Sequence, residues 1–225
     1  MLPKELSNGI CSLNPQEDRL AFSCLCELDK QGNITDYKFA KTVIRSRVKG
    51  VYSEINSLLA GSDDAELKEK YADVSGQLPI IKELADILYK NKKNRGCPEL
   101  ETSESKLIIN DEDICVGVER RTRGRSEEII EDFMLVANEC AARFGMDNNL
   151  PFVYRIHEEP SDEKLESLRE ALVKLNVQYK LGEKACPGDM SEILKAAKGT
   201  DIDLIMNNIV LRSMSTVSYT HLTLP

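Results

Sequence analysis

The sequence lacks the features that would assign it to a membrane, an oxidising compartment or a repeat architecture. No stretch approaches the length of a membrane span without charged residues, and residues 1–5 do not begin an apolar signal-peptide core. The seven cysteines are odd in number and irregularly spaced, which makes a poor disulfide framework and fits a reducing cytosol. No repeat period and no long low-complexity linker is visible. We therefore expect a cytoplasmic protein with no membrane partner.

Basic charge and histidine are also scarce. The formal net charge is -8, so the overall field repels phosphate, and any RNA binding must come from a local groove. With two histidines in the chain, Cys24 and Cys26 have few further ligands for a metal site, and we interpret them as small buried hydrophobic residues. Hydrophobic residues at 41% and charged residues at 30% indicate one ordinary globular domain with a sizeable core.

Alternation of apolar residues predicts two antiparallel hairpins. The first joins residues 20–28 to 34–44 through a polar turn, and the second joins 105–110 to 114–119 through an acidic turn. A further strand is predicted at 152–157. These segments predict extended structure within an otherwise helical chain.

Helical periodicity accounts for most of the remaining chain. The longest predicted helix begins with Ser126 as its N-cap and buries one stripe formed by Ile130, Phe133, Met134, Ala137, Cys140, Ala141 and Phe144. Other helices are predicted at 52–59, 64–94 with an interruption near Gly76 and Pro79, 161–175, 190–197 and 201–214. The fold class is α+β, with a mixed sheet or antiparallel hairpins packed against several long helices.

Two acidic clusters invite a metal interpretation that their surroundings do not favour. Asp111, Glu112 and Asp113 lie at a predicted turn, and Asp63 and Asp64 lie at a predicted helix start. Acids are common at both kinds of position because their side chains bond to nearby backbone N–H groups. We therefore expect no metal ligands among them.

Several unusual residue strings occur in a fixed order across nearly the whole chain. They cover residues 2–15, 18–24, 44–46 with Tyr52, 95–96, 130–139, 154–157 and 211–214. Together these strings resemble the catalytic domain, or RNB domain, of the RNase II and RNase R family, and they are nearer to RNase R. On this resemblance residues 1–214 form a partial RNB catalytic domain.

The resemblance implies a processive hydrolytic exoribonuclease that works from the 3′ end of single-stranded RNA, with no preference for DNA. Its products are nucleoside 5′-monophosphates, and its cofactor is Mg²⁺, which takes hard carboxylate ligands. In the family the metal-binding aspartates precede the string that opens this chain, and a phosphate-binding arginine follows further on. We expect both to be absent here, so that the chain holds no catalytic or metal-binding residue and is inactive alone.

The resemblance also implies three RNA-binding residues. Tyr52 matches an aromatic that stacks on a nucleotide near the 3′ end, Glu131 matches a carboxylate that contacts the terminal nucleotide and would accept from ribose hydroxyls, and Arg123 matches a family arginine. Each of these three residues also has an explanation that involves no RNA. A tyrosine can simply pack a helix start, an exposed helical glutamate can be solvated, and an arginine can belong to a solvated loop.

Other positions are less informative. Leu100 stands where some relatives carry a second aromatic residue that stacks with the first, and leucine has no π system with which to stack. Arg120, Arg121, Arg123 and Arg125 form a basic run that either touches phosphates or lies in a solvated loop. We expect structural roles for Arg155 and His157.

Two further readings stay open, and the end of the chain needs its own explanation. A catalytically silent relative that binds RNA or protein as a scaffold would carry the same strings, whereas an unrelated helical interaction module would require coincidence. Residues 215–225 do not continue the family pattern and resemble translated adapter sequence. We expect them to be non-native and exposed or loosely placed.

Overall fold

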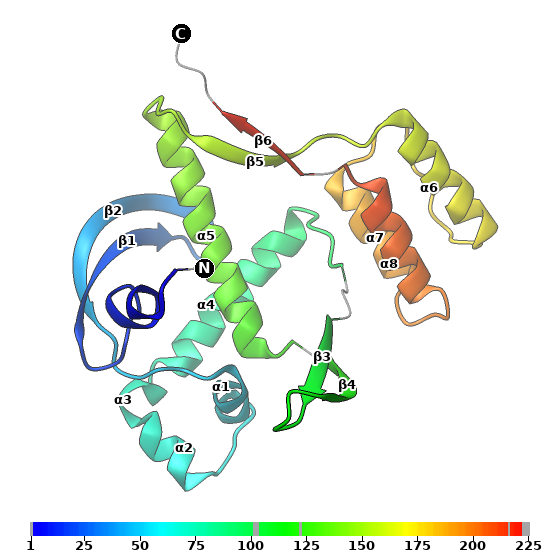
Figure 1. The fold of residues 1–225 in the computed structure, drawn as a ribbon. Coiled ribbons are helices and arrows are strands. Elements are labelled where there is room, and N and C mark those ends of the chain that lie inside the picture. Colours follow the sequence, from blue (N-terminus) through cyan, green and yellow to red (C-terminus); the bar gives the residue numbers. More distant parts are fainter. Residues whose placement is uncertain (1, 101–103, 122, 216, 222–225) are drawn as a thin grey trace. The chain divides into compact units, whose positions relative to one another are not determined.

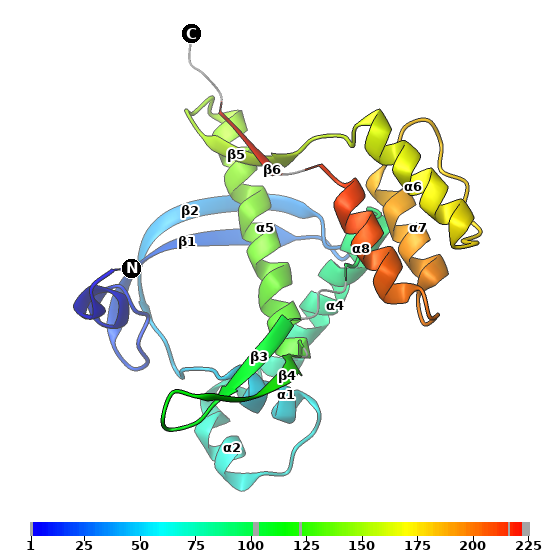
Figure 2. The same ribbon diagram turned by 45° about the vertical axis from the view of Figure 1, so that its right-hand side comes forward.

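The computed structural model describes residues 2–100, 104–121, 123–215 and 217–221. The chain divides into two compact units, one formed by Met1–Asn91 and Arg123–Arg143 and the other by Lys92–Thr122 and Phe144–Pro225. Helices alternate with short antiparallel hairpins in both units (Figures 1 and 2). The predicted α+β class is therefore confirmed. None of the helices in the described ranges is long and apolar enough to cross a membrane.

The first unit contains the predicted N-terminal hairpin. After a short π-helix at Glu5–Ile10, strands β1 (Asp18–Leu28) and β2 (Ile34–Arg45) pair antiparallel, with Leu20 opposite Val43. In the connecting turn, Oδ1 of Asp29 accepts backbone N–H bonds from Gln31 and Asn33. Gly32 has a positive φ of 81° there, a conformation that side-chain-bearing residues rarely adopt.

Four helices follow in this order: α1 (Tyr52–Leu59), α2 (Ala65–Lys70), α3 (Ala72–Ser75) and α4 (Leu78–Asn94). The predicted interruption near Gly76 and Pro79 is present, because α3 ends at Ser75 and α4 begins at Leu78. Pro79 is the second residue of α4, where its missing N–H costs no helical hydrogen bond. Asp64 caps α2 by accepting from the N–H groups of Glu66 and Leu67, which confirms its local role.

Helix α5 (Arg125–Asp147) is the longest, and it corrects two expectations. It begins at Arg125, so Ser126 lies inside the first turn rather than at the N-cap. Its buried positions include Ser126, Ile129, Asp132 and Cys140, whereas Ile130, Met134 and Phe144 of the predicted stripe are exposed. The helix carries apolar residues on more than one face, and periodicity alone does not show which face becomes buried.

Cys140 on α5 meets the first hairpin. Its Sγ lies 3.7 Å from Sγ of Cys26, and the Cys140 side chain is fully buried. Burial, with the neighbouring thiols, raises the pKa of Cys140 to about 12. Cys24 and Cys26 are both only partly buried, so the expectation that they are buried is met in part.

The second unit contains the other predicted hairpin, formed by β3 (Glu104–Ile109) and β4 (Cys115–Arg121). Asn110 organises its turn, because Oδ1 accepts from the N–H groups of Glu112 and Ile114. The acidic residues there are turn residues, as expected.

Strand β5 (Val153–His157) pairs antiparallel with β6 (Val217–His221). The expectation of a loosely placed tail is therefore wrong for residues 217–221, whose backbone pairs with that of β5. Residues 216 and 222–225 lie outside the described part.

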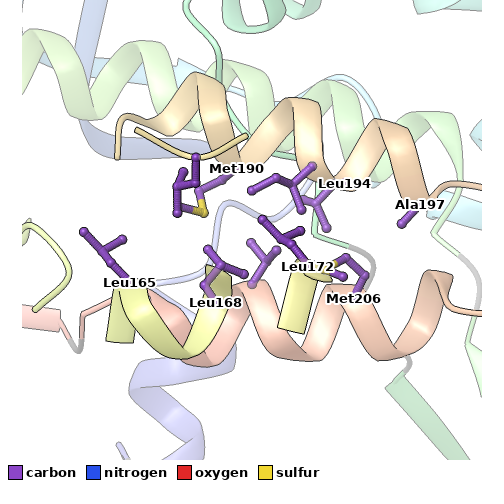
Figure 3. Packing of buried hydrophobic residues seen from close by; sticks show 10 residues of the cluster. Leu165, Leu168, Leu172, Met190, Leu194, Ala197 and Met206 are labelled. Atoms are coloured by element: carbon purple, nitrogen blue, oxygen red, sulfur yellow. The ribbon is translucent and has the colours of Figure 1, made fainter. Parts of the chain in front are cut away.

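The three remaining helices, α6 (Asp162–Lys174), α7 (Pro187–Ala197) and α8 (Asp203–Ser213), form a hydrophobic core. Its buried members are Leu165, Leu168, Leu172, Leu181, Met190, Ile193, Leu194, Ala197, Met206 and Val210. Figure 3 shows the labelled leucine and methionine side chains of the three helices directed toward one another. Burial of this apolar surface stabilises the packing of the three helices against one another.

Candidate nucleic-acid interface

Tyr52 is the first residue of α1 and is held through its backbone. The N–H of Val51 donates to Oη of Tyr71 at 3.1 Å, and the carbonyl of Tyr52 accepts from the hydroxyl of Ser126 at 3.1 Å. The Tyr52 residue is 46% exposed. The structure thus fixes the backbone at this position and leaves much of the side chain open to a ligand.

Tyr71 anchors the same helix start from the other side. Its ring is buried, and its hydroxyl donates to the carboxylate of Glu54, which also accepts from Nζ of Lys70 at 2.5 Å. Lys70, followed by Tyr71, holds the pKa of Glu54 below its ordinary value. The first turn of α1 is therefore tied to the end of α2 by a charged cluster.

Arg123 and Glu131, both predicted to bind RNA, contact each other directly. Nη1 of Arg123 donates to Oε2 of Glu131 at 2.8 Å, and the two side chains are 62% and 44% exposed. An arginine guanidinium carries five N–H donors, and this bond uses one of them. The pair presents a cation and a carboxylate side by side on the surface.

A polar network joins the α1 part of the site to the α5 part. Asn56 on α1 accepts through Oδ1 from the N–H of Ser126 at 2.8 Å and donates through Nδ2 to Oε2 of Glu127 at 3.0 Å. Glu127 also accepts from the N–H of Gly124 at 3.1 Å, and its Oε2 lies 3.1 Å from the Ser126 hydroxyl, whose single hydrogen is shared with the carbonyl of Tyr52. Burial alone would raise the pKa of Glu127, but the bonds from Asn56, Ser126 and Gly124 outweigh it and hold the pKa below its ordinary value.

Gly124 allows this close approach. A Cβ atom at this position would collide with the side-chain amide of Asn56. A side chain at position 124 would therefore displace the Asn56 amide from this network. The network and the glycine together explain why Tyr52, from one part of the sequence, lies beside the start of α5.

Arg125, in the same basic run, has a different role. Arg125 forms ion pairs with Asp86 at 2.6 Å and Glu128 at 2.9 Å, so its charge is neutralised within the protein. The backbone of Arg120 and Arg121 belongs to strand β4, so their predicted placement in a loop is wrong. The side chains of these two residues lie outside the described part.

Three further sequence predictions fall in the second unit. Leu100 is partly buried and packs against the core formed by α6, α7 and α8. Arg155 is exposed on β5, and the backbone of His157 pairs with Val217. The side chain of His157 lies outside the described part. Leu100 therefore has a packing role in place of a stacking one.

The residues that the structure describes do not form a magnesium site. Within the described ranges, no group of three or more His, Cys, Asp or Glu side chains could hold a metal ion. Asp63 pairs with Lys68 at 2.8 Å, and Asp64 caps α2. A magnesium site needs convergent oxygen ligands, so this donor set does not fit the cofactor.

Sequence reasoning missed Asn56, Gly124 and Glu127. One local signal was available, because Glu127 is the third helical residue of α5 and accepts from the N–H of the residue preceding the helix, as in half of a capping box. Asn56 gave no such signal, since its partners Ser126 and Glu127 are 70 and 71 residues away in the sequence.

Comparison with known proteins gives consistent matches. The model of the RNB domain family matches residues 1–225. The chain is 36% identical to ribonuclease R 1 of Lactococcus lactis and 35% identical to ribonuclease R of Escherichia coli, in each case over 97% of this chain and 27% of the relative. The structure of Mycoplasma genitalium RNase R in complex with ribose-methylated single-stranded RNA matches with a TM-score of 0.88 and 26% identity, over 97% of this chain and 34% of that one. The chain thus spans about a quarter to a third of the length of these relatives.

Proposed function

Because this chain belongs to the RNB domain family, we propose that it forms the RNA-gripping part of a processive hydrolytic 3′-to-5′ exoribonuclease resembling ribonuclease R. The substrate is the 3′ end of single-stranded RNA, and the products are nucleoside 5′-monophosphates. The observation that carries the proposal is the contact between α1 and the start of α5, which joins Tyr52 to the segment that carries Arg123, just before α5, and Glu131, in its second turn. The names of the related ribonucleases support the same assignment.

Each residue has a chemical task in this proposal. The exposed ring of Tyr52 stacks on a base, and stacking suits a degradative enzyme because every base offers a π face. Arg123 donates to a phosphate oxygen, and the carboxylate of Glu131 accepts from ribose hydroxyls, which DNA lacks at the 2′ position. The ion pair between them limits the motion of both side chains before RNA arrives. Since the net charge is -8, the attraction for RNA is local to this surface.

Magnesium belongs to the proposed enzyme, but the described residues of this chain do not form a site for it. When bound in a nuclease, the metal activates water and stabilises the leaving oxygen of the phosphodiester. In this proposal the described residues bind and orient RNA and take no part in the catalytic step. We propose that the ligands lie in the part of the relatives that this chain does not span, that the chain alone is inactive, and that the complete protein works in the cytoplasm.

Residues 1–214 are proposed as native RNB sequence and residues 215–225 as a non-native continuation. After residues 211–214 the family pattern runs through a Gly-His-Phe-Gly-like segment, which this chain lacks. A genomic read across the junction tests this. In-frame continuation of residues 219–225 into a segment containing Arg-Arg-Tyr would show that the tail is native.

The central experiment compares this chain with the complete protein encoded by the same gene. Both are incubated with a uniformly labelled RNA that has a single-stranded 3′ end, with and without Mg²⁺. We expect metal-dependent release of mononucleotides from the complete protein, and weak binding without cleavage from the chain. Cleavage by the chain would refute its proposed inactivity. RNA binding without cleavage by the complete protein would favour the catalytically silent scaffold.

A further inference from the structure

Asn56 and Glu127 lie between the two parts of the proposed RNA-contact site. Asn56 is one helical turn after Tyr52 on α1, and Glu127 is midway between Arg123 and Glu131 in the sequence of the α5 start. The 3.0 Å bond from Nδ2 of Asn56 to Oε2 of Glu127 connects these two helices side chain to side chain. The bond therefore has a second candidate role besides stabilising the start of α5.

Hydrogen bonds fix the orientation of both side chains. The amide of Asn56 uses its oxygen for the N–H of Ser126 and its nitrogen for Glu127, so rotating the amide by half a turn would break both bonds. Glu127 receives bonds from Asn56, Gly124 and Ser126, all on Oε2. A Cβ at position 124 would overlap the Asn56 amide, so glycine at this position keeps the amide in its place.

The binding residues themselves have no comparable restraint from packing. Tyr52 is 46% exposed, and the side chains of Arg123 and Glu131 are 62% and 44% exposed. Exposed side chains take their position from the backbone that carries them and from directional polar contacts. The place of Tyr52 relative to the ion pair therefore depends on the junction between α1 and α5.

We propose that Asn56 and Glu127 are a positioning pair, whose hydrogen bond sets Tyr52 at the spacing from Arg123 and Glu131 that RNA requires. The inference rests on the proposed function and adds to it two residues that do not touch the RNA. A plain helix-capping role makes a different prediction. In that case, loss of the bond lowers stability but leaves the affinity of the folded protein for RNA unchanged.

Swapping the donor and the acceptor of this hydrogen bond distinguishes the positioning role from the helix-capping role. Asn56→Asp removes the donor to Glu127 and places two carboxylates together, whereas Asn56→Asp with Glu127→Gln restores a donor and an acceptor in reversed order. Ser57→Asp is the matched control. It adds the same charge one residue along α1, at an exposed serine whose hydroxyl bonds only to the carbonyl of Ser53 among its described contacts.

The first measurement needs no RNA. The chain contains no tryptophan, so Tyr52→Trp introduces a single fluorescent reporter at the binding position. In this background we expect Asn56→Asp to change the emission and the acrylamide quenching of Trp at position 52. The double variant should return both toward the starting values, and Ser57→Asp should leave them as they were.

The second measurement is the affinity for a single-stranded RNA, by fluorescence anisotropy, corrected for the folded fraction. With Tyr52 in place, Asn56→Asp should weaken binding about tenfold, a typical coupling between contacting residues, and the exchange variant should recover most of it. If Asn56→Asp does not fold, Glu127→Ala with Glu128→Ala as its control replaces it, since both remove one carboxylate from the first turn of α5.

The outcomes distinguish the two proposals. Parallel loss and recovery of the reporter signal and of RNA affinity support the positioning pair. If Tyr52→Ala weakens RNA binding while Asn56→Asp leaves both readouts unchanged, the positioning role is overturned and the proposed function is supported. If the reporter responds and recovers but no variant, including the parent chain, binds RNA, the coupling stands and the proposed function is overturned.

Discussion

The helices α6, α7 and α8 and the junction between α1 and α5 are held together by different forces. The three helices contribute nine buried apolar residues to one core, which Leu181 from the segment between α6 and α7 completes, and the attraction among them needs no particular bond direction. At the junction, hydrogen bonds from Asn56 and Ser126 are directional, and the residues proposed to bind RNA stay exposed. The apolar core stabilises the chain, whereas the polar junction between α1 and α5 determines where exposed side chains lie.

The largest effect should come from opening the apolar core. Ile193 is fully buried, and Ile193→Ala should lower the free energy of unfolding by about 2–5 kcal/mol, because it removes apolar contacts and leaves a cavity. Urea unfolding followed by circular dichroism measures the change. Val173→Ala, at a residue 80% exposed on α6, is the control and should have little effect. Equal losses from both variants would show that this core does not stabilise the chain.

The next effect should appear in RNA binding and not in stability. Tyr52→Ala removes a largely exposed ring and should weaken binding of single-stranded RNA by about 1–3 kcal/mol, the usual range for a lost stack. In the complete enzyme the length of the final product should also change. Tyr52→Phe keeps the ring and serves as the control, and a similar loss from that variant would argue against stacking.

A smaller effect concerns the choice of sugar. Glu131→Ala should reduce the preference for RNA over DNA of the same sequence by about 1 kcal/mol, the net value of one hydrogen bond. Competition between the two oligonucleotides measures the ratio directly, so that a general loss of affinity cancels. An unchanged ratio would assign Glu131 to the ion pair with Arg123 alone.

The smallest effect should be a pH dependence of the junction. The pKa of Glu127 lies below the ordinary value of 4.5, so its contribution to stability is complete above that value and is lost as pH falls through the folded-state pKa. The emission of a Tyr52→Trp reporter, followed from about pH 6 to about pH 3, should change in this acidic range. Glu127→Gln does not titrate and should reduce that change. A response unaffected by Glu127→Gln would place the titrating group elsewhere.

The local elements were predictable because they depend on near neighbours in the sequence. Alternation identified the hairpin of β1 and β2, and helical periodicity located α1 and α6 closely. Errors arose where local signals conflict. Ser126 looks like an N-cap, yet α5 begins at Arg125, and Glu127 bonds the N–H of Gly124 instead.

The sequence by itself determined the family, the α+β class and the candidates Tyr52, Arg123 and Glu131, because residue strings and periodicity are properties of the chain. The tertiary structure alone decided that α5 buries Ile129 and exposes Ile130, since an amphipathic pattern does not specify its partner. It also decided that Asn56 bonds to Glu127, 71 residues further along. Such a bond depends on the folded path of the backbone, which brings distant donors and acceptors within reach and leaves no trace in local sequence.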